Sequence, residues 1–565
     1  MAGDVEPRPA KAALFEQFAA DGIRHMFGNP GTVEQGFLDL VDASDTSYVL
    51  ALHEGVAVAM ADGYARASGR PAVVQLHSSA GLGNAIGMLY QALRGGSPLV
   101  ALAGEAGLRY DAMDAQMAAD LVAMAAPVTK YATRVVHPDS VLRVLRRAVK
   151  IAATPPRGPV LVVLPADVLE ELTAEPAVPA PVPVTRSAPD AATTREAADL
   201  LLAGERPLIL MGDGVAVSGA QRELTDVAER LGARVWGVNS SEVNMDTTHP
   251  LFAGVLGHMS GDDSARVVAG ADAVLIVGTY VFPEVFPRLA SPFRPGARLV
   301  HVDADPYEIA KNFPVDLGVA ADPKAALGAL AAELGRRGRT ASAAGRGRGT
   351  APASTTEPAA GPAPAPSAPL AAPLSAEPSL MERFCTTLAA RAPHDLAVFD
   401  EALTASGDLV RHLPPRLPGT YFQTRGGSLG VGIPGAMGVK LARPDLEVVG
   451  FTGDGGSMYT IQALWTAARY GIDATFVVCN NGRYRLLDLN LDVYRETRPG
   501  GGPQARTAAP PQAFDLSRPA IGFTGLAESL GVPAVRVETP GQIGPAVDAA
   551  LGGTGPFLID LVTTN

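Results

Sequence analysis

Two polar turns near the C-terminal end of the sequence could bind a metal ion together with phosphate groups. The first, Gly453-Asp454-Gly455-Gly456-Ser457, follows the apolar segment LEVVGFT, and the second, Asn480-Asn481-Gly482, follows ATFVVC. If both segments are strands of one parallel sheet, their carboxyl ends point the same way, so Asp454 and Asn481 converge although they are 27 residues apart. Carboxylate and amide oxygens suit Mg²⁺, which completes its octahedron with phosphate oxygens and water. A helix expected to begin near Ser457 would add free N–H donors for the same phosphates.

Either turn taken alone is also typical of an ordinary tight turn, because Gly and Asn are the usual turn residues. The sequence contains its own comparison, since Gly212-Asp213-Gly214 follows the apolar segment PLILM and Asn239 lies downstream. That copy has no Asn doublet, and we interpret it as a plain strand-to-helix turn. The predicted metal site therefore depends on the spaced pair of turns.

The elements that must position these turns alternate between short β-rich runs and helical runs. From Pro71 to Gly104, PAVVQLH and PLVALAG flank the glycine-punctuated SSAGLGNAIGMLYQALRGG, which predicts a parallel β-α-β unit. The same alternation begins with a helix around Leu14 and Phe18. It returns near the C-terminus in LEVVGFTG, SMYTIQALWTAARYG and ATFVVCNN. We expect an α/β protein with three doubly wound parallel-sheet domains.

Shifts in composition set the expected domain limits. We expect a first domain over residues 1–185 and, after the proline-rich AEPAVPAPVPVTRSAPD, a second over 190–335. Residues 336–378 are almost wholly Ala, Pro, Gly, Ser, Thr and Arg, a composition that cannot bury enough apolar surface to offset chain entropy. This stretch is predicted to be a disordered or extended linker. The third domain is expected over 379–565.

The overall composition excludes several classes of protein. A formal net charge of −12 and a pI near 5.3 disfavour binding to nucleic acid or to anionic membranes. Two cysteines, Cys385 and Cys479, are too few for a disulfide framework or an all-cysteine metal site. The sequence shows neither a signal peptide nor an apolar run long enough to span a bilayer. We expect a cytoplasmic protein without membrane or nucleic-acid partners.

The two C-terminal turns at this spacing resemble the diphosphate and Mg²⁺ motif of thiamine diphosphate (ThDP) dependent enzymes, the superfamily of 2-oxo acid decarboxylases and acetolactate synthases. In the first domain, His53-Glu54-Gly55 and the following AVAMADGYARASG resemble the segment that carries this family's cofactor-activating glutamate. The loop Gly28–Thr32, the segment QLHSSAGLGNAIG and the block IQALWTAARYGI are similar, within the family, to benzoylformate decarboxylases. The resemblance implies pyrimidine-binding, central and diphosphate-binding domains, with ThDP and Mg²⁺ as cofactors.

The resemblance implies catalytic roles for residues of the first domain. Glu54, which could otherwise be a surface helix cap, would hold a carboxyl group against N1′ of the aminopyrimidine and so favour deprotonation of thiazolium C2. Thr32 with Gln35 is typical of a capping box and would also face the substrate carboxylate. His77 could be structural, and by family position would be a proton relay or carboxylate partner. His53 has no such match and is expected to lie behind the residues that touch the cofactor.

The resemblance also implies the cofactor-binding set. Leu429, in GGSLGVGIPGA, could be an ordinary core residue and by family position would be the apolar wedge beneath the bent cofactor. Asp454, Asn481 and the backbone oxygen of Arg483 would bind Mg²⁺. The full cofactor-binding set would be Glu54, Leu429, Gly453, Asp454, Gly455, Gly456, Ser457, Asn481 and Tyr484.

The sequence departs from the family pattern where the substrate is recognised. The segment VGTYVFPEVFPRLA has no histidine where benzoylformate decarboxylases carry a second catalytic one, and Val285 is the expected occupant. Asn490 falls where the resemblance would place an aromatic residue. The side chains of Arg485 and Asp488 are expected to face the pocket and to favour a polar substrate. No motif decides whether the central domain binds FAD or a coenzyme A nucleotide.

The leading hypothesis is non-oxidative decarboxylation of a 2-oxo acid, through a C2 ylide and an enamine, with release of an aldehyde. The alternatives are a carboligase of the acetolactate synthase type, a 2-hydroxyacyl-coenzyme A lyase, and a ThDP-binding partner protein of low activity. Family resemblance further implies a homodimer or homotetramer whose active site lies at the subunit interface.

Overall fold

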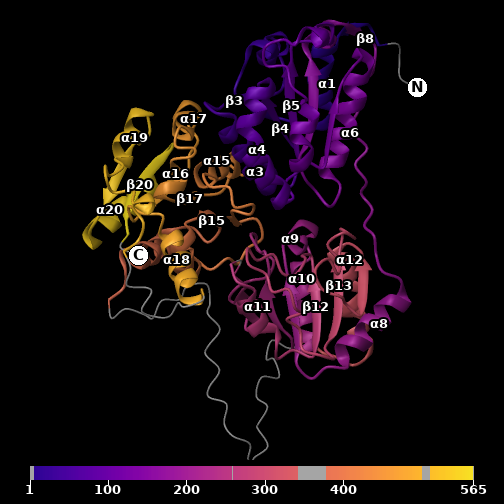
Figure 1. Cartoon of the computed structure of the whole chain (residues 1–565), viewed down its shortest axis with the longest axis vertical. Coiled ribbons are helices and arrows are strands. Elements are labelled where there is room, and N and C mark those ends of the chain that lie inside the picture. The colour runs from indigo at the N-terminus through magenta and orange to yellow at the C-terminus, as the bar shows by residue number, and fades with distance from the viewer. Residues whose placement is uncertain (1–4, 258, 342–376, 499–508, 564–565) are drawn as a thin grey trace, which may run out of the picture. The chain divides into compact units, whose positions relative to one another are not determined.

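The computed structural model describes residues 5–257, 259–341, 377–498 and 509–563. It contains three six-stranded parallel sheets flanked by helices (Figure 1), which confirms the predicted fold class. Two compact units are distinguished, one comprising Met1–Pro183, Pro378–Leu413 and Phe422–Asn565, and the other Val184–Glu377 and Pro414–Tyr421. Most of the predicted linker, residues 342–376, lies outside the described residues, and the predicted domain limits stay predictions.

The N-terminal sheet has the strand order β3-β2-β4-β5-β7-β6. Its central strands read as continuous apolar runs, as expected for strands covered on both faces, and every residue of β4 and β7 is buried. The strands are β2 (His25–Gly28), β3 (Ser47–Leu50), β4 (Ala72–Leu76), β5 (Leu99–Glu105), β6 (Tyr131–Arg134) and β7 (Val160–Pro165), and a separate pair joins β1 (Arg8–Pro9) to β8 (Leu172–Thr173). The helices are α1 (Ala10–Asp21), α2 (Gln35–Leu38), α3 (Glu54–Ser68), α4 (Ser78–Gly95), α5 (Leu121–Ala125), α6 (Val141–Ala153) and α7 (Ala166–Glu170).

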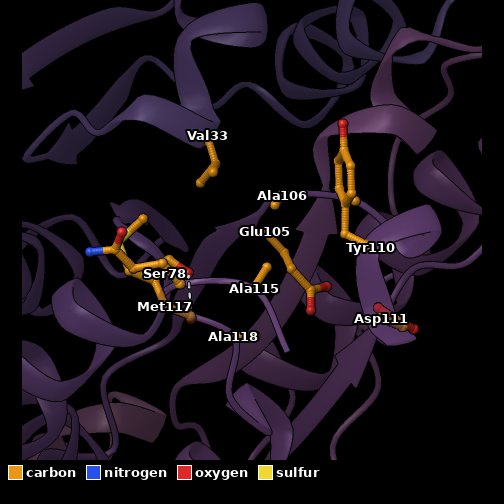
Figure 2. A pocket seen from close by; sticks show the side chains of 11 residues that line it. Val33, Ser78, Glu105, Ala106, Tyr110, Asp111, Ala115, Met117 and Ala118 are labelled. Carbon is orange, nitrogen blue, oxygen red and sulfur yellow. Dashed lines mark hydrogen bonds between the residues drawn. The ribbon is translucent and has the colours of Figure 1, made fainter. Parts of the chain in front are cut away.

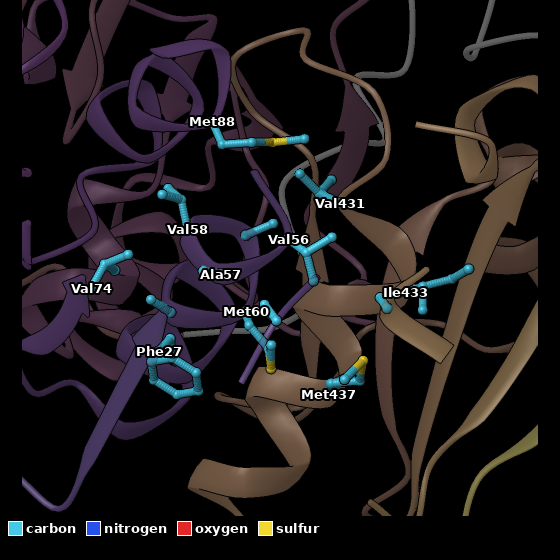
Figure 3. Close-up of a cluster of buried hydrophobic side chains, with 14 of the residues drawn as sticks. Phe27, Val56, Ala57, Val58, Met60, Val74, Met88, Val431, Ile433 and Met437 are labelled. Carbon is cyan, nitrogen blue, oxygen red and sulfur yellow. The ribbon is translucent and has the colours of Figure 1, made fainter. Parts of the chain in front are cut away.

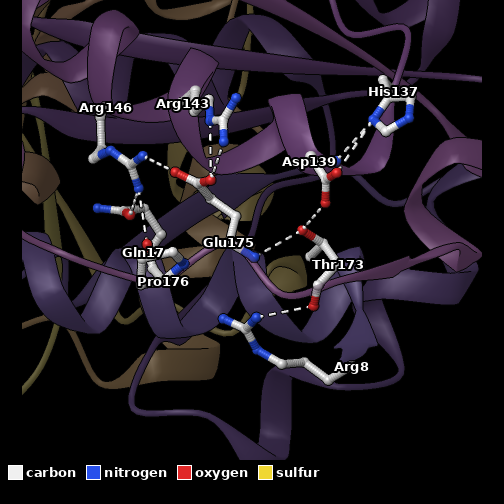
Figure 4. A network of polar contacts seen from close by, with 9 residues as sticks. All are labelled: Arg8, Gln17, His137, Asp139, Arg143, Arg146, Thr173, Glu175 and Pro176. Carbon is white, nitrogen blue, oxygen red and sulfur yellow. Dashed lines mark hydrogen bonds and ion pairs between the residues drawn. The ribbon is translucent and has the colours of Figure 1, made fainter. Parts of the chain in front are cut away.

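A polar network fixes the chain where it leaves this sheet (Figure 4). The Glu175 carboxylate accepts hydrogen bonds from Arg143 and Arg146 of α6, at 2.9 and 2.5 Å. Arg146 also reaches Gln17 of α1. The exit segment is therefore bound to two helices of the N-terminal domain.

The central sheet has the order β11-β10-β9-β12-β13-β14. An apolar cluster drawn from both the strands and the helices forms its core. Its strands are β9 (Pro207–Met211), β10 (Arg234–Gly237), β11 (Phe252–Val255), β12 (Ala273–Val277), β13 (Arg298–Asp303) and β14 (Leu317–Ala320). Its helices are α8 (Ala191–Leu202), α9 (Gly214–Ser218), α10 (Gln221–Leu231), α11 (Gly261–Val268) and α12 (Pro323–Arg336).

The C-terminal sheet has the order β16-β15-β17-β18-β20-β19. Its strands are β15 (Ala397–Glu401), β16 (Tyr421–Gln423), β17 (Val448–Gly453), β18 (Thr475–Asn480), β19 (Ala534–Val537) and β20 (Phe557–Val562). Its helices are α13 (Leu380–Arg391), α14 (Ser406–His412), α15 (Gly432–Ala442), α16 (Asp454–Ser457), α17 (Ala463–Tyr470), α18 (Arg485–Thr497), α19 (Phe523–Ser529) and α20 (Pro540–Gly552). None of the helices described combines the length and apolar character needed to cross a bilayer.

The helix predicted from Ser457 is wrong at its start. A single turn, α16, begins at Asp454, and α17 begins only at Ala463. At the end of α16 the Ser457 hydroxyl donates to the Asp454 carbonyl at 2.8 Å, and between the two helices the Thr460 hydroxyl donates to the Gly430 carbonyl at 2.6 Å. Backbone hydrogen bonds between residues three apart replace the α-helical pattern here, so the chain turns at the sheet edge before α17 begins.

Helices α3 and α15 pack closely and join the N-terminal and C-terminal sheets into one unit. A Cβ atom at Gly63 would collide with the Gly435 carbonyl, and one at Gly438 with the Met60 carbonyl. Glycine at these positions lets the two backbones touch. Buried apolar side chains surround the contact (Figure 3), among them Val56 and Met437.

Candidate active site

The two polar turns predicted from the sequence meet at the carboxyl edge of the C-terminal sheet. Strands β17 and β18 are neighbours and parallel, with Gly453 opposite Cys479. The Asp454 carboxylate accepts the N–H of Gly455 at 2.7 Å and the N–H of Gly482, in the second turn, at 2.6 Å. Burial raises the pKa of Asp454, and these N–H donors lower it. The convergence expected from parallel strands is therefore present.

Asn481 presents its side chain within the same second turn. Its Oδ1 accepts the N–H of Arg483 at 3.0 Å, which fixes the amide oxygen close to the backbone that follows. The Tyr484 ring packs against the first turn, because a Cβ at Gly455 would collide with it. The open space beside Gly453, where a Cβ would meet nothing within 4 Å, leaves room for a bound group.

The similar triplet in the central sheet has a different environment. The Asp213 carboxylate accepts bonds from the Ser241 N–H and hydroxyl, the Glu242 N–H and the Asn244 amide. These protein donors hold it inside the turn that joins β9 to α9. The prediction that this triplet is a strand-to-helix turn is confirmed, since it joins β9 to α9.

The expectation that Asp488 faces the pocket is wrong. Its carboxylate is buried and accepts two hydrogen bonds from the Arg483 guanidinium, from Nε at 2.8 Å and from Nη2 at 3.1 Å. Two parallel bonds of this kind are geometrically specific. The ion pair ties the side chain of Arg483, at the end of the second turn, to helix α18.

Glu54 is a buried residue rather than a surface cap, since only 4% of it is exposed. It opens α3, whose cap is the His53 ring, with Nδ1 accepting the Gly55 N–H at 3.0 Å. One oxygen of the Glu54 carboxylate accepts the Asn29 amide at 3.3 Å and the other accepts the Asn84 amide at 3.0 Å. Two amide donors therefore orient the carboxylate.

Neither asparagine was singled out from the sequence. Asn29 lies in the loop Gly28–Thr32 and Asn84 in α4, both within segments that carry the family resemblance. An asparagine beside glycines is typical of a turn, so the only available signal was the family segment itself.

His77 lies at the carboxyl end of β4 and pairs with a carboxylate that the sequence did not reveal. Its Nδ1 is 2.8 Å from Oε2 of Glu34, whose side chain is fully buried. Burial raises the pKa of Glu34, and the hydrogen bond to His77 lowers it. A Cβ at Gly31 would collide with the His77 ring, so the loop backbone packs directly on the imidazole.

The capping box predicted at Thr32 and Gln35 is wrong. A 3₁₀ turn begins at Thr32, its cap is Gly31, and no side chain caps it. Gly31 has extended backbone angles, and its approach to His77 brings the loop close to the sheet edge. The Thr32 hydroxyl is thus not used for capping.

A hollow lies against both of these segments (Figure 2). Val33, in the 3₁₀ turn, and Ser78, the residue after His77, both line it. Ser78 has a φ of 45°, a left-handed conformation that costs energy in a non-glycine residue, and its hydroxyl donates to the Met117 carbonyl at 3.3 Å. The other lining residues are Glu105, Ala106, Gly107, Tyr110, Asp111, Ala115, Gln116, Met117 and Ala118.

Leu429 is half-buried in a loop that is fixed at both ends. Before it, the Ser428 hydroxyl donates to the Gly87 carbonyl at 2.8 Å. After it, Gly430 has a φ of +93°, and its carbonyl accepts the Thr460 hydroxyl. Leu429 is thus an accessible apolar residue in an ordered loop rather than a core residue.

Comparison with known proteins identifies the family. Three family models match in order, the N-terminal TPP binding domain of thiamine pyrophosphate enzymes over residues 9–124, the central domain over 194–330 and the C-terminal TPP binding domain over 404–561. The chain belongs to the thiamine pyrophosphate enzyme family. It is 32% identical to a benzoylformate decarboxylase of Pseudomonas aeruginosa, over 98% of both chains.

Two further relatives show the breadth of this family. The chain is 26% identical to an acetolactate synthase of Arthrospira platensis, over 98% of this chain and 94% of the relative. It is also similar to the solved structure of a thiamine diphosphate-dependent 4-hydroxybenzoylformate decarboxylase of Rhodococcus jostii, at 29% identity and a TM-score of 0.82 over 98% and 99% of the two chains. The chain is therefore a ThDP-dependent enzyme of the decarboxylase and acetolactate synthase family.

Proposed function

We propose that this enzyme is a Mg²⁺-dependent decarboxylase that converts a 2-oxo acid into an aldehyde and carbon dioxide. The observation that carries the proposal is the buried Glu54 carboxylate, oriented by Asn29 and Asn84. Similarity to benzoylformate decarboxylase over nearly the whole chain supports the same reaction class.

Asp454, Asn481 and the Arg483 carbonyl would hold Mg²⁺, and the N–H groups of Gly453–Ser457 would receive the diphosphate. No group of three or more His, Cys, Asp or Glu side chains that could hold a metal occurs in the described residues. A site of two protein side chains and a carbonyl suits Mg²⁺, because this ion takes its remaining ligands from phosphate and water. The donor set and the open space at Gly453 fit the group.

When bound, ThDP supplies the nucleophilic carbon and the electron sink of the reaction. Glu54 would hold a proton at the aminopyrimidine, and Leu429 would support the cofactor from below. Tyr484, which packs against Gly455, would help to close the diphosphate site.

His77 and Thr32 would act on the substrate. The ring of His77 is oriented by Glu34 through Nδ1, which leaves Nε2 as the atom for exchanging a proton or contacting the substrate carboxylate. Thr32, free of a capping role, would donate its hydroxyl to that carboxylate. Ser78 and Val33 adjoin the hollow, which would take the variable group of the acid.

The proton donor for the final step differs from the family pattern. No histidine occurs in VGTYVFPEVFPRLA, and Val285, the residue expected there, is exposed. Without that histidine, attack on a second carbonyl compound competes with protonation. A carboligase of the acetolactate synthase type is the second candidate, and the 26% identical acetolactate synthase supports it.

The active enzyme would be a homodimer or a homotetramer, with each cofactor between the Glu54 domain of one subunit and the Asp454 domain of another. A reducing, cytoplasmic setting would suit the two cysteines, Cys385 and Cys479, which are buried and not disulfide-bonded.

Identification of the organic product tests the proposal. The protein is incubated with ThDP, Mg²⁺ and either pyruvate or benzoylformate, and the products are identified by mass. An aldehyde supports the decarboxylase, whereas a hydroxyketone without free aldehyde replaces it with the carboligase.

A further inference from the structure

A carboxylate that the sequence did not single out lies beneath the loop that carries Leu429. Glu401 is the last residue of β15, and only 1% of it is exposed. Strand β15 runs beside β17 with Glu401 opposite Thr452, two positions before Asp454. Burial raises the pKa of Glu401 to about 7, although the N–H groups of Gly432 and Gly430 oppose the shift. Such an acid needs compensating donors to be tolerated in the interior.

Those donors come from the Leu429 loop. Oε1 of Glu401 accepts the Gly430 N–H at 2.5 Å, and Oε2 accepts the Gly432 N–H at 2.7 Å. Gly432 is the first residue of α15, which has no side-chain cap from its own segment. The carboxylate therefore caps this helix from a neighbouring strand, where a negative charge is favourable.

The same carboxylate also contacts the segment that leads to the diphosphate turn. Oε2 accepts the Thr452 hydroxyl at 3.1 Å. A Cβ at Gly456 would lie 3.7 Å from Oε1, so the carboxylate lies beside the turn. One side chain thus bonds both to the loop of Leu429 and to Thr452, the residue directly before the turn that includes Asp454.

We propose that Glu401 is a positioning residue that fixes the Leu429 loop relative to the turn Gly453–Ser457. The inference rests on the proposed function, in which Leu429 supports the cofactor and the turn holds its diphosphate. If both segments are held by one carboxylate, the wedge and the diphosphate site keep a constant separation. The bend imposed on the cofactor then depends on Glu401, although Glu401 does not touch the reacting atoms.

The adjacent residue provides a matched control. Asp400 is fully buried on the same strand and points to the opposite face. Its carboxylate accepts the Ala402 N–H and the Ser406 hydroxyl, each at 2.8 Å, and the Gln423 amide at 3.3 Å, and these partners lie outside residues 427–432. Asp400→Asn therefore changes a buried acid of the same strand without changing the proposed positioning contact.

The experiment compares Glu401→Gln, Glu401→Asp and Asp400→Asn. Hydrogen–deuterium exchange over residues 427–432 is measured in the protein without cofactor, and exchange of the thiazolium C2 proton is measured with saturating ThDP and Mg²⁺. In Glu401→Gln, an amide NH₂ group replaces a carboxylate oxygen that accepts a hydrogen bond from a backbone N–H, so that bond is lost. Exchange over the loop should accelerate about 10- to 100-fold, as expected for loss of a charge-assisted hydrogen bond.

The C2 proton should exchange at least about 10-fold more slowly in Glu401→Gln, because a displaced wedge removes the near-attack geometry. Glu401→Asp keeps the charge, so the changes in loop exchange and in C2 exchange should be smaller than in Glu401→Gln. This variant provides the test if Glu401→Gln does not fold. Asp400→Asn should leave both rates as in the wild type.

Unchanged loop exchange in Glu401→Gln would overturn the proposal, and so would equal effects of the Glu401 and Asp400 variants. The loop measurement needs no cofactor, so it decides whether Glu401 anchors the loop even if the wild-type protein fails to exchange the C2 proton. That latter failure would instead contradict the proposed function.

Discussion

Replacing Glu54 by glutamine tests the chemistry assigned to the first domain. Each oxygen of this buried carboxylate accepts one amide donor, from Asn29 at 3.3 Å and from Asn84 at 3.0 Å. The carboxamide of Glu54→Gln keeps one acceptor and turns its NH₂ group toward the other donor. The variant has nearly the same shape, so the position of α3 should not change.

The magnitude follows from what the amide loses. One charge-assisted hydrogen bond is worth about 1.5–3 kcal/mol, and because it is formed with or without cofactor, the affinity for ThDP should change by less than about 10-fold. An amide cannot hold the exchanging proton, and loss of a general acid–base group costs about 10²- to 10⁴-fold in rate, or about 3–5 kcal/mol of barrier. Glu54→Asp keeps the acid on a side chain one methylene shorter, and its rate should fall between those of the wild type and Glu54→Gln.

Exchange of the thiazolium C2 proton with deuterium, measured by NMR after acid quench, reports this step without requiring a known substrate. Cofactor affinity is measured in parallel by fluorescence titration. A C2 exchange rate in Glu54→Gln within twofold of the wild type, at saturating ThDP, would refute the role of Glu54.

Three further predictions concern other carboxylates. Asp454→Ala should abolish Mg²⁺-dependent binding of ThDP in calorimetric titration. The control Asp213→Ala, in the similar triplet of the central sheet, should lower stability and leave ThDP affinity unchanged. An equal loss of ThDP affinity in both variants would reject the metal assignment. The Glu34 carboxylate lies 2.8 Å from His77 Nδ1, and a hydrogen bond to one ring nitrogen orients the other nitrogen of a catalytic imidazole. Glu34→Gln should therefore lower kcat about 10-fold or more with little change in KM. Steady-state kinetics that match the wild type would make the pair purely structural. Burial raises the pKa of Asp303 from 3.8 to about 7, so the folded chain retains a proton that the unfolded chain loses, and stability falls as pH rises through this window. At about 1.4 kcal/mol per pKa unit, reduced because Asp303 is part-exposed, Asp303→Asn should stabilise the protein by on the order of 3 kcal/mol at pH 8 and little at pH 4; urea unfolding curves with the same offset at both pH values would contradict this.

The fold could be predicted because it is encoded by local patterns. Apolar runs such as PAVVQLH and LEVVGFT, separated by glycine-punctuated helical segments, are typical of parallel sheets covered on both faces. The exact start of a helix was less accessible. The break between Ser457 and Ala463 depends on a hydroxyl contact to Gly430, far away in the sequence, and no local pattern reveals it.

The meeting of the two polar turns was predictable because each turn directly follows a strand of the same parallel sheet. Asp454 lies beside glycines directly after a strand, and the convergence with the second turn follows from parallel geometry. The partners that orient the acidic and basic groups were not predictable. Glu34 reaches His77 across 43 residues, Asn84 reaches Glu54 across 30, and Glu401 reaches Thr452 across 51, contacts that only the folded sheet edges create.

The most direct test of the central claim is release of carbon dioxide from a panel of 2-oxo acids, comprising pyruvate and branched, aromatic and guanidino members. Purified protein is assayed with ThDP and Mg²⁺, without ThDP, and as Glu54→Gln. The account predicts release from at least one acid that requires ThDP and is largely lost in Glu54→Gln. Absence of release from every acid by fully ThDP-loaded protein, or release that persists without ThDP, would contradict it.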